Sequence, residues 1–388
     1  MRLPARLASL VIVGVALIGA GQSASATCHF SKIVELPVTM SGMQPLVSAR
    51  INGVDTFFVA DSGAFFSSIS APKAAELNLP LKPWHGMLIS GVGGDLTPSL
   101  TSVKAFTLVN VPLKDVDFIV AGGGWGDAAG LLGQNVLSVL GLADVEYDLG
   151  DGAIRLWLPK DCDGHSLAYW NQDQYSVIPI SKPDETNPHT AGQVLVNGVK
   201  IPVLFDTGAG MSMMSLHAAA RLGITPNSPG VVPAGETFGI GRGTVRTWIA
   251  PIASLQIGDE QINNTKVRIG DMDLGEADML LGADFFLSHR VLVANSQSKL
   301  YFTYNGGPVF NLSGATELKT AAGDAAKPSP VAGVGPEPTD AARPSPRGGI
   351  LSTPSQIWIA PASLRPPRRS IFASGRWRTG PMASRSWP

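Results

Sequence analysis

The sequence predicts an all-β chain of two tandem β-barrel lobes, related by a pseudo-two-fold axis and accompanied by short helices. Three observations lead to this prediction. An acidic motif follows an apolar strand twice, as Asp61-Ser62-Gly63-Ala64 and as Asp206-Thr207-Gly208-Ala209. The same turn and helix signals surround both copies at a constant spacing. The 388 residues include 44 Gly and are only 15 % charged, which is typical of turn-rich β structure.

An Asn-Gly pair precedes each acidic motif. Asn52-Gly53 and Asn197-Gly198 both end eight residues before the Asp. Asn-Gly between apolar runs indicates a hairpin, because a type I′ turn needs positive φ at both central residues. We therefore expect a hairpin whose second strand leads into each Asp.

A short helix is expected after each acidic motif. Ser70 and Ser215 each open a segment that carries Ala and Leu on one face, as a Ser-capped helix would. The offset is 206 − 61 = 145 for the Asp residues and 215 − 70 = 145 for the Ser residues. The matching spacing indicates an internal duplication.

Two later motifs extend the duplication. A Gly-rich segment at 91–94 corresponds to 239–243, and Leu-Leu-Gly at 131–133 corresponds to 280–282, now with an offset of 282 − 133 = 149. Two further strands are expected at the end of each copy. Asn135 and Asp284, which follow the Leu-Leu-Gly motifs, are expected to pack beneath the acidic loops.

These motifs resemble those of the retropepsin-like and pepsin-like aspartic proteases. Most similar are bacterial proteins with two retropepsin-like lobes in one chain, and the resemblance spans residues 33 to 304. It implies that Asp61 and Asp206 form a catalytic pair. It also assigns supporting roles, with hydroxyls bonding across to the other lobe and glycines bringing amides close to the carboxylates, to Ser62, Gly63, Thr207 and Gly208.

Two carboxylates in contact supply the chemistry for peptide hydrolysis. Like charges that close cannot both ionise, so the pair shares one proton. One member then activates water while the other protonates the scissile carbonyl. The expected function is an exported aspartic endopeptidase that uses the Asp61/Asp206 pair. The alternative is a catalytically inactive protease-like module that binds peptides without cleaving them.

The Gly-rich segments are interpreted as flaps that close over a substrate. A flap needs backbone freedom, and the substrate peptide beneath it is expected to be extended. The candidate flap residues are Gly91, Val92, Gly93, Gly239, Ile240 and Gly241. The second segment does not fit the phosphate-binding pattern Gly-x-Gly-x-x-Gly. The segment 122–127 is expected to be a flexible turn or a loop that shapes a subsite.

The chain departs from the family pattern at four positions. Phe65 and Gly210 stand where related proteins often carry a small polar or acidic residue, and Gln134 and Ala283 stand where retropepsins have Arg. We expect these changes to affect lobe packing more than chemistry, because both acidic motifs are intact.

Five segments are expected along the chain. Residues 1–26 combine Arg2 and Arg6 with an apolar run and end in Ala-Ser-Ala, which predicts a signal peptide and a periplasmic or secreted protein. A membrane anchor and lipidation at Cys28 are the weaker alternatives. The N-terminal lobe is placed at 27–159, a linker at 160–174 and the C-terminal lobe at 175–312. Residues 313–388 are rich in Pro, Ala and Arg and are expected to be disordered. This basic tail either stays in solvent or binds anionic polymers or membrane surfaces of the cell envelope.

Cys28 and Cys162 are the two cysteines of the chain, and they bracket the first copy of the repeat. In an exported protein such a pair predicts a disulfide. Two buried free thiols are the alternative.

Composition and histidine spacing argue against nucleic acid, metal ions and other cofactors as ligands. A net charge of −1 offers no footprint for nucleic acid. The six His residues lack metal-ligand spacing, so neither a metal nor another cofactor is expected. The expected partner is a peptide or protein substrate, bound by a monomer whose lobes pair within one chain and whose mature form has no transmembrane segment. Lobe pairing between two chains is the alternative.

Overall fold

The structure, a computed structural model, describes residues 27–310 and Leu312, apart from residues 86, 123–124, 139–141, 183–188, 240 and 242. The predicted signal peptide (1–26) and tail (313–388) lie outside these described residues, as does the candidate flap residue Ile240. No helix in the described part of the chain is long and apolar enough to cross a membrane.

Six strands of the first lobe close into a barrel. Their spatial order is β2, β3, β10, β4, β9 and β8, and β8 pairs back onto β2 with Phe106 opposite Ile51. The strands span Gln44–Ile51 (β2), Val54–Ala60 (β3), Gly130–Leu132 (β10), Ser68–Ile69 (β4), Val111–Val120 (β9) and Ser99–Leu108 (β8). Ring closure leaves this lobe with an enclosed apolar interior.

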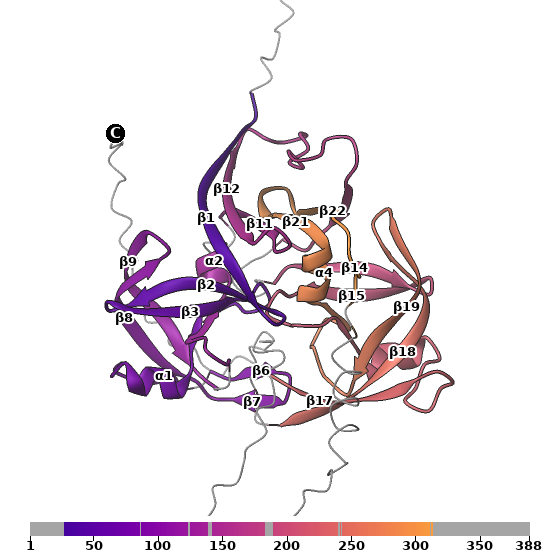
Figure 1. Cartoon of the computed structure of the whole chain (residues 1–388), viewed down its shortest axis with the longest axis horizontal. Helices are drawn as coiled ribbons and strands as arrows, with labels where there is room; N and C mark the ends of the chain where they lie inside the picture. Colours follow the sequence, from indigo (N-terminus) through magenta and orange to yellow (C-terminus); the bar gives the residue numbers. More distant parts are fainter. Residues whose placement is uncertain are drawn as a thin grey trace, which may run out of the picture.

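The second lobe repeats the first strand for strand. Its ring is β14, β15, β20, β16, β19 and β18, closed by pairing of β18 with β14. The strands span Ala191–Val196 (β14), Val199–Phe205 (β15), Met279–Leu281 (β20), Met213–Ser215 (β16), Glu260–Gly270 (β19) and Thr244–Ile257 (β18). The two barrels stand side by side in Figure 1 and confirm the predicted all-β fold of two tandem lobes.

The predicted Asn-Gly turns are confirmed. Asn52 and Gly53 have φ values of 48° and 90°, and Asn197 and Gly198 have values of 49° and 77°. The first turn joins β2 to β3 and the second joins β14 to β15, both antiparallel pairs. Each turn thereby directs a strand toward an acidic motif.

The predicted Ser-capped helices are confirmed as well. The Ser70 hydroxyl accepts a hydrogen bond from the Lys73 amide at 3.2 Å, and the Ser215 hydroxyl accepts one from the Ala218 amide at 3.0 Å. The helices span Ala71–Glu76 (α1), Gln134–Leu137 (α2), Leu216–Arg221 (α3) and Ala283–Ser288 (α4), with a 3₁₀ turn η1 at Asn295–Gln297.

A six-stranded sheet joins the lobes. Its order is β13, β22, β21, β11, β12 and β1, with three strands from each lobe. They span Ser176–Pro179 (β13), Lys299–Tyr304 (β22), His289–Ala294 (β21), Asp144–Asp148 (β11), Ala153–Lys160 (β12) and His29–Ser41 (β1). Antiparallel pairing of β11 with β21 places Tyr147 opposite Val291 and makes the two lobes one hydrogen-bonded body.

Four further strands lie outside the two barrel rings and the joining sheet. They are β5 (Lys82–Pro83), β6 (Ile89–Gly91), β7 (Gly94–Leu96) and β17 (Val232–Phe238). Figure 1 shows β6, β7 and β17 at the bottom of the view and the joining sheet at the top. The strands expected to carry the flaps therefore face away from the sheet that joins the lobes.

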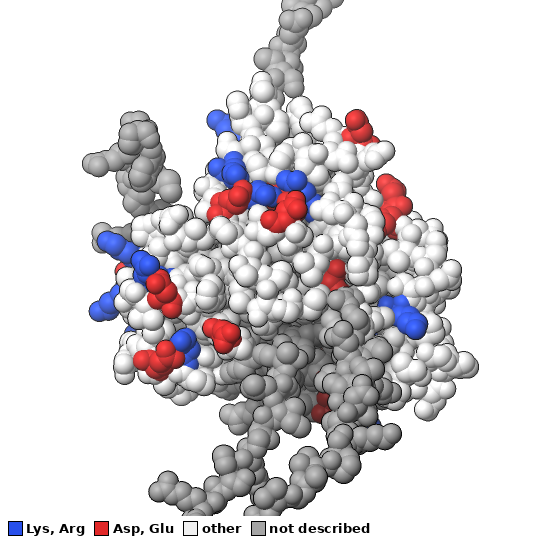
Figure 2. Space-filling model, viewed as in Figure 1, with Lys and Arg blue, Asp and Glu red and all other residues white. Residues whose placement is uncertain are grey.

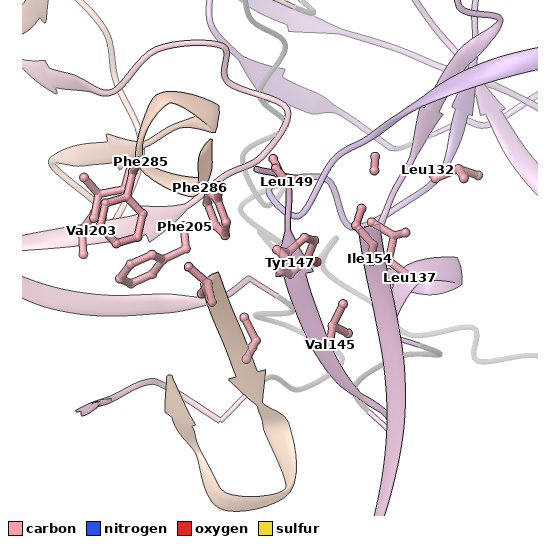
Figure 3. Packing of buried hydrophobic residues seen from close by; sticks show 14 of the residues in the cluster. Leu132, Leu137, Val145, Tyr147, Leu149, Ile154, Val203, Phe205, Phe285 and Phe286 are labelled. Carbon is pink, nitrogen blue, oxygen red and sulfur yellow. The ribbon is translucent and has the colours of Figure 1, made fainter. Parts of the chain in front are cut away.

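One apolar core runs through both lobes beneath the joining sheet. The Tyr147 ring of the first lobe packs edge-on against the Phe286 ring of the second, with centroids 5.4 Å apart. Figure 3 shows part of this cluster and labels Leu132, Leu137, Val145, Tyr147, Leu149, Ile154, Val203, Phe205, Phe285 and Phe286. Each buried aromatic or aliphatic side chain contributes about 1.5–3 kcal/mol relative to its exposed state, so the lobes are coupled by packing as well as by the sheet.

A buried carboxylate links the lobes electrostatically. The Glu146 carboxylate accepts hydrogen bonds from Arg155 at 2.7 Å, Trp157 at 3.0 Å and Tyr169 at 2.6 Å. It also accepts one at 2.9 Å from Arg290, which belongs to the second lobe. A buried charge is tolerated when it is paired and hydrogen-bonded in this way. Elsewhere, charged side chains are sparse on the face that Figure 2 shows, with both signs interspersed.

The predicted disulfide between Cys28 and Cys162 is present. It closes a loop with a sequence separation of 134 residues, so it ties the start of the first lobe to its end. Cys162 packs among the apolar side chains of Leu167 and Tyr301, close to the second lobe. The bridge restrains the unfolded chain more than the folded one.

Replacing both cysteines by Ser is expected to lower the free energy of unfolding by about 4 kcal/mol, because the bridge closes a long loop. Equilibrium denaturation of the oxidised wild type and of the Cys28→Ser/Cys162→Ser variant measures this difference. Reductant should reproduce the loss in the wild type and leave the variant unchanged. Equal free energies of unfolding for the two proteins would contradict the disulfide between Cys28 and Cys162.

Candidate active site

The two acidic motifs lie at matching places in the two barrels. Asp61 directly follows β3, which runs parallel to β10, and Asp206 directly follows β15, which runs parallel to β20. The Asp61 amide donates to the Leu132 carbonyl at 2.9 Å, and the Asp206 amide donates to the Leu281 carbonyl at 2.8 Å. Each Leu-Leu-Gly strand therefore fixes the start of an acidic loop.

Backbone amides orient each carboxylate in the same manner. Oδ1 of Asp61 accepts hydrogen bonds from the amides of Gly63 and Ala64, both at 2.9 Å. Oδ1 of Asp206 accepts from the amides of Gly208 at 2.9 Å and Ala209 at 3.1 Å. The second oxygen, Oδ2, is buried in both residues and has no hydrogen-bond partner among the described residues. One oxygen of each acid is thus held in place and the other is left for chemistry.

Ser62 and Thr207 hydrogen-bond across the two lobes and hold the acidic loops together. The Ser62 hydroxyl donates to the Phe205 carbonyl at 2.8 Å, and the Thr207 hydroxyl donates to the Ala60 carbonyl at 2.7 Å. Each hydroxyl oxygen also accepts from the opposite backbone amide, Thr207 Oγ1 at 3.0 Å and Ser62 Oγ at 2.9 Å. Four reciprocal bonds therefore determine how the acidic loops face each other.

Gly63 and Gly208 bring the two acids into contact. A Cβ atom added to Gly63 would overlap the Asp206 carboxyl group, and one added to Gly208 would overlap that of Asp61. Each carboxyl group accordingly lies against the glycine of the other lobe. Only a residue without a side chain permits this approach, which is why the motif carries glycine at both positions.

Burial raises the pKa of both acids. The pKa of Asp61 lies well above its usual range because the group is buried and because it faces the charge of Asp206. Burial also raises the pKa of Asp206 to about 6. Since two charges so close repel each other strongly, the pair retains one proton over a wide pH range, and its titration belongs to the pair rather than to either residue.

Side chains beneath the acidic loops support them in both lobes. Asn135 accepts hydrogen bonds from the amide and hydroxyl of Ser67 at 2.8 Å, and Asp284 accepts from the amide and hydroxyl of Ser212 at 2.9 and 2.7 Å. The packing predicted for Asn135 and Asp284 is therefore confirmed. Gln134 donates to the Ser62 carbonyl at 2.9 Å, so its amide supports the first loop directly.

His189 lies at the site and was missed by the sequence analysis. Its ring is buried beside the Gly63 backbone of the other lobe, and burial lowers its pKa to about 4. The residue therefore stays neutral next to the two acids above that pH. The duplication could have pointed to His189, because it stands 145 residues after Gln44 and is therefore its counterpart. Gln44 is also polar and buried, and it begins strand β2 of the first barrel.

The two Gly-rich segments touch each other, a contact that the sequence analysis did not anticipate. The Gly241 amide donates to the Val92 carbonyl at 3.1 Å, and the Gly243 amide donates to the Gly93 carbonyl at 2.8 Å. A Cβ atom on Gly241 would overlap the Gly93 backbone. Gly91 closes the β6–β7 hairpin opposite Gly94. Gly239, the remaining described candidate of the second segment, follows the end of β17.

No group of three or more His, Cys, Asp or Glu side chains in the described part of the chain could hold a metal ion.

The raised pKa of Asp206 predicts a pH dependence of stability. The native state keeps this proton up to about pH 6, whereas the unfolded chain releases it near pH 4. As pH rises across this window the unfolded state binds fewer protons than the native state, so wild-type stability falls. Asp206→Asn removes this group and also the charge that helps to raise the pKa of Asp61, so its free energy of unfolding relative to that of the wild type should rise by a few kcal/mol, in order of magnitude, between pH 4 and pH 7.

Denaturant unfolding at both pH values checks this expectation, with the exposed Asp151→Asn as the control for loss of one carboxylate. Burial also raises the pKa of Asp144 and of Asp284 to about 6, but both residues are present in all three proteins and contribute equally to the pH dependence of their stability. Parallel pH dependence of Asp206→Asn and the wild type would contradict the raised pKa.

Family models match each lobe separately. A model described as "Aspartyl protease" matches residues 47–136, and one described as "gag-polyprotein putative aspartyl protease" matches residues 192–288. No curated protein matches the chain.

Solved structures with some likeness include a retropepsin-like aspartic protease from Rickettsia conorii. It is 22 % identical, the match covers 29 % of this chain and 84 % of that one, and the TM-score is 0.23. An aspartic proteinase from Irpex lacteus is 12 % identical over 70 % of this chain and 97 % of its own, with a TM-score of 0.44.

Each family match spans the features that build the site. The first contains Asp61 and the Leu-Leu-Gly strand beside it, and the second contains Asp206 and its corresponding strand. Two matched lobes, closed as equivalent barrels around paired acidic loops, agree with the resemblance found in the sequence. The two family matches support a retropepsin-like aspartic protease assignment for each lobe.

Proposed function

We propose that the protein is an exported aspartic endopeptidase in which Asp61 and Asp206 activate water to hydrolyse peptide bonds. The contact between the two buried carboxyl groups, each against the glycine of the other lobe, carries this proposal. A module that only binds peptides would gain nothing from holding two acids together, since their mutual repulsion costs stability.

The shared proton defines the reaction. Because the proton is shared by the pair, the reaction is written with Asp61 as the protonated member and Asp206 as the base, and exchanging these roles gives the same chemistry. Asp206 takes a proton from water, whose oxygen attacks the scissile carbonyl carbon, while Asp61 protonates the carbonyl oxygen. A neutral gem-diol results. Its C–N bond breaks as Asp206 passes its proton to the leaving nitrogen and a gem-diol hydroxyl returns one to Asp61, so the pair ends as it began.

The substrate in this proposal is an extended peptide that lies between the acids and the flaps of one monomer. Export rests on the Arg-flanked apolar N-terminal segment and its Ala-Ser-Ala site, and the disulfide suits an oxidising compartment such as the periplasm or the medium. Glycine at both flap tips allows the backbones to separate when a peptide enters.

Cleavage of a mixed peptide library between about pH 3 and pH 8 tests the proposal. Single Asp61→Asn and Asp206→Asn substitutions should each reduce kcat by about a thousandfold or more, because either loss removes the shared proton or its acceptor. Burial shifts the working range of the wild type toward neutral pH relative to ordinary carboxyl groups.

Asp144→Asn is the matched control, since Asp144 is a buried carboxyl group outside the pair. Its cleavage rate should remain within a few-fold of the wild type. Activity that survives either substitution in the pair would sink the proposed mechanism. Peptide binding without any cleavage would instead favour the protease-like binding module.

Gly241→Ala tests the contact between the flaps. The added methyl group would overlap the Gly93 backbone, so the two amide–carbonyl bonds between the tips should be lost. We expect faster hydrogen exchange at residues 89–96 and a raised KM, with little change in the exchange of the joining sheet. Gly198→Ala, which strains a positive-φ turn away from the flaps, controls for a general loss of stability. Unchanged exchange at the tips in Gly241→Ala would contradict the contact.

A further inference from the structure

A buried guanidinium group in the second lobe has no anionic partner among the residues that the structure describes. The Arg268 side chain on β19 is 4 % exposed. Its Nη1 donates to the Ala234 carbonyl at 3.0 Å and to the Thr247 hydroxyl at 2.7 Å, and its Nη2 approaches Met211 Sδ at 3.7 Å. Its Nε has no partner among the described residues.

The nearest acid does not neutralise this cation directly. Asp284 affects Arg268 only through space, and its carboxylate is already bound by the amide and hydroxyl of Ser212. Arg268 makes no ion pair within the described part of the chain. Burying a charge without a counter-ion costs several kcal/mol. A cation held in this way, with a donor still unused, points to an anion that arrives from outside.

The contacts of Arg268 place it between the acidic loop and the flap. Met211 follows Asp206 by five residues. Ala234 and Thr247 belong to β17 and β18, the two strands that lead to and from the flap tip at Gly241. The guanidinium group therefore bridges the segment that follows the acidic loop and the two strands that carry the flap of the second lobe.

The duplication shows which residue the first lobe has at the same place. Ser68 pairs with Ile119 on β9, and Met213 pairs with Arg268 on β19. Ser68 and Met213 are equivalent, since 213 − 68 = 145. Ile119 is therefore the counterpart of Arg268.

An apolar cluster surrounds this position in each lobe. Five buried members of the first cluster, Val59, Ala64, Trp125, Ala128 and Leu131, correspond to Leu204, Ala209, Leu274, Ala277 and Leu280 of the second. Ile119 belongs to the first cluster, whereas the second adds Val92 from the flap of the opposite lobe. Trp125, in the segment expected to be a turn or a subsite loop, is buried in the first cluster. The two sides of the site thus differ in charge although their frames are the same.

We propose that Arg268 is a specificity-determining residue that binds an Asp or Glu side chain of the substrate on the second-lobe side of the acid pair. The inference rests on the proposed function. The unused Nε and the adjacent Nη2 form the edge that a carboxylate binds in a two-point contact, and because Nε is buried in this structure, the flap above it has to open for binding. The Ile119 side takes an apolar residue instead. A Lys or Arg at the acidic position is excluded by repulsion.

The proposal is tested on the full exported protein with pairs of peptides that carry either Glu or Gln at one position and are otherwise identical. The variable position is placed in turn at each of the three positions on either side of the cleaved bond. The wild type should favour Glu about tenfold or more in kcat/KM at one position, mainly through KM. Arg268→Gln removes the charge but keeps a donor for Ala234 and Thr247, and it should abolish this preference while it still cleaves the Gln peptide.

Arg246→Met is the matched control, because Arg246 is exposed on β18 and lies over the Trp248 ring rather than in the site. It should keep the Glu preference. A wild type that cleaves without preferring Glu, or a preference that persists in Arg268→Gln, overturns the role of Arg268 and leaves the protease function intact. If the Arg268 variant does not fold, the wild-type comparison alone decides. Absence of all cleavage overturns the proposed function itself.

Discussion

The structure depends on holding two buried acids in contact, an arrangement that charge repulsion opposes. Four reciprocal bonds through Ser62 and Thr207 keep the acidic loops together, and glycine at Gly63 and Gly208 removes the atoms that would separate them. The joining sheet, the shared apolar core and the Glu146–Arg290 contact all oppose separation of the lobes. The strain of the acid pair is thus offset by cohesion elsewhere in the molecule.

Two equivalent barrels in one chain are free to diverge, and they have done so around the site. Asn135 supports the first acidic loop, whereas the ionisable Asp284 supports the second. Ile119 in one lobe corresponds to Arg268 in the other. A symmetric dimer would carry each change twice. Within a single chain, one side of the site can gain a charge while the other remains apolar.

Much of the fold and of the acid pair was predictable from the sequence because local spacing determines it. The Asn-Gly turns, the Ser caps and the Asp-hydroxyl-Gly loops need particular residues at particular positions. The disulfide followed from a cysteine pair that brackets one repeat. Contacts made between the lobes were less accessible. The position of His189 beside Gly63 and the pairing of the flap tips depend on how the barrels dock, which no local pattern specifies.

Carbon-13 labelling of the Asp carboxyl groups, followed by NMR from about pH 3 to pH 9, tests the central claim most directly. The signals of Asp61 and Asp206 are assigned by their absence in the single Asn variants. The account predicts that the two groups titrate as a coupled pair, with widely separated apparent pKa values and at least one well above the usual range for Asp. Independent titration of both groups near pH 4 would contradict it.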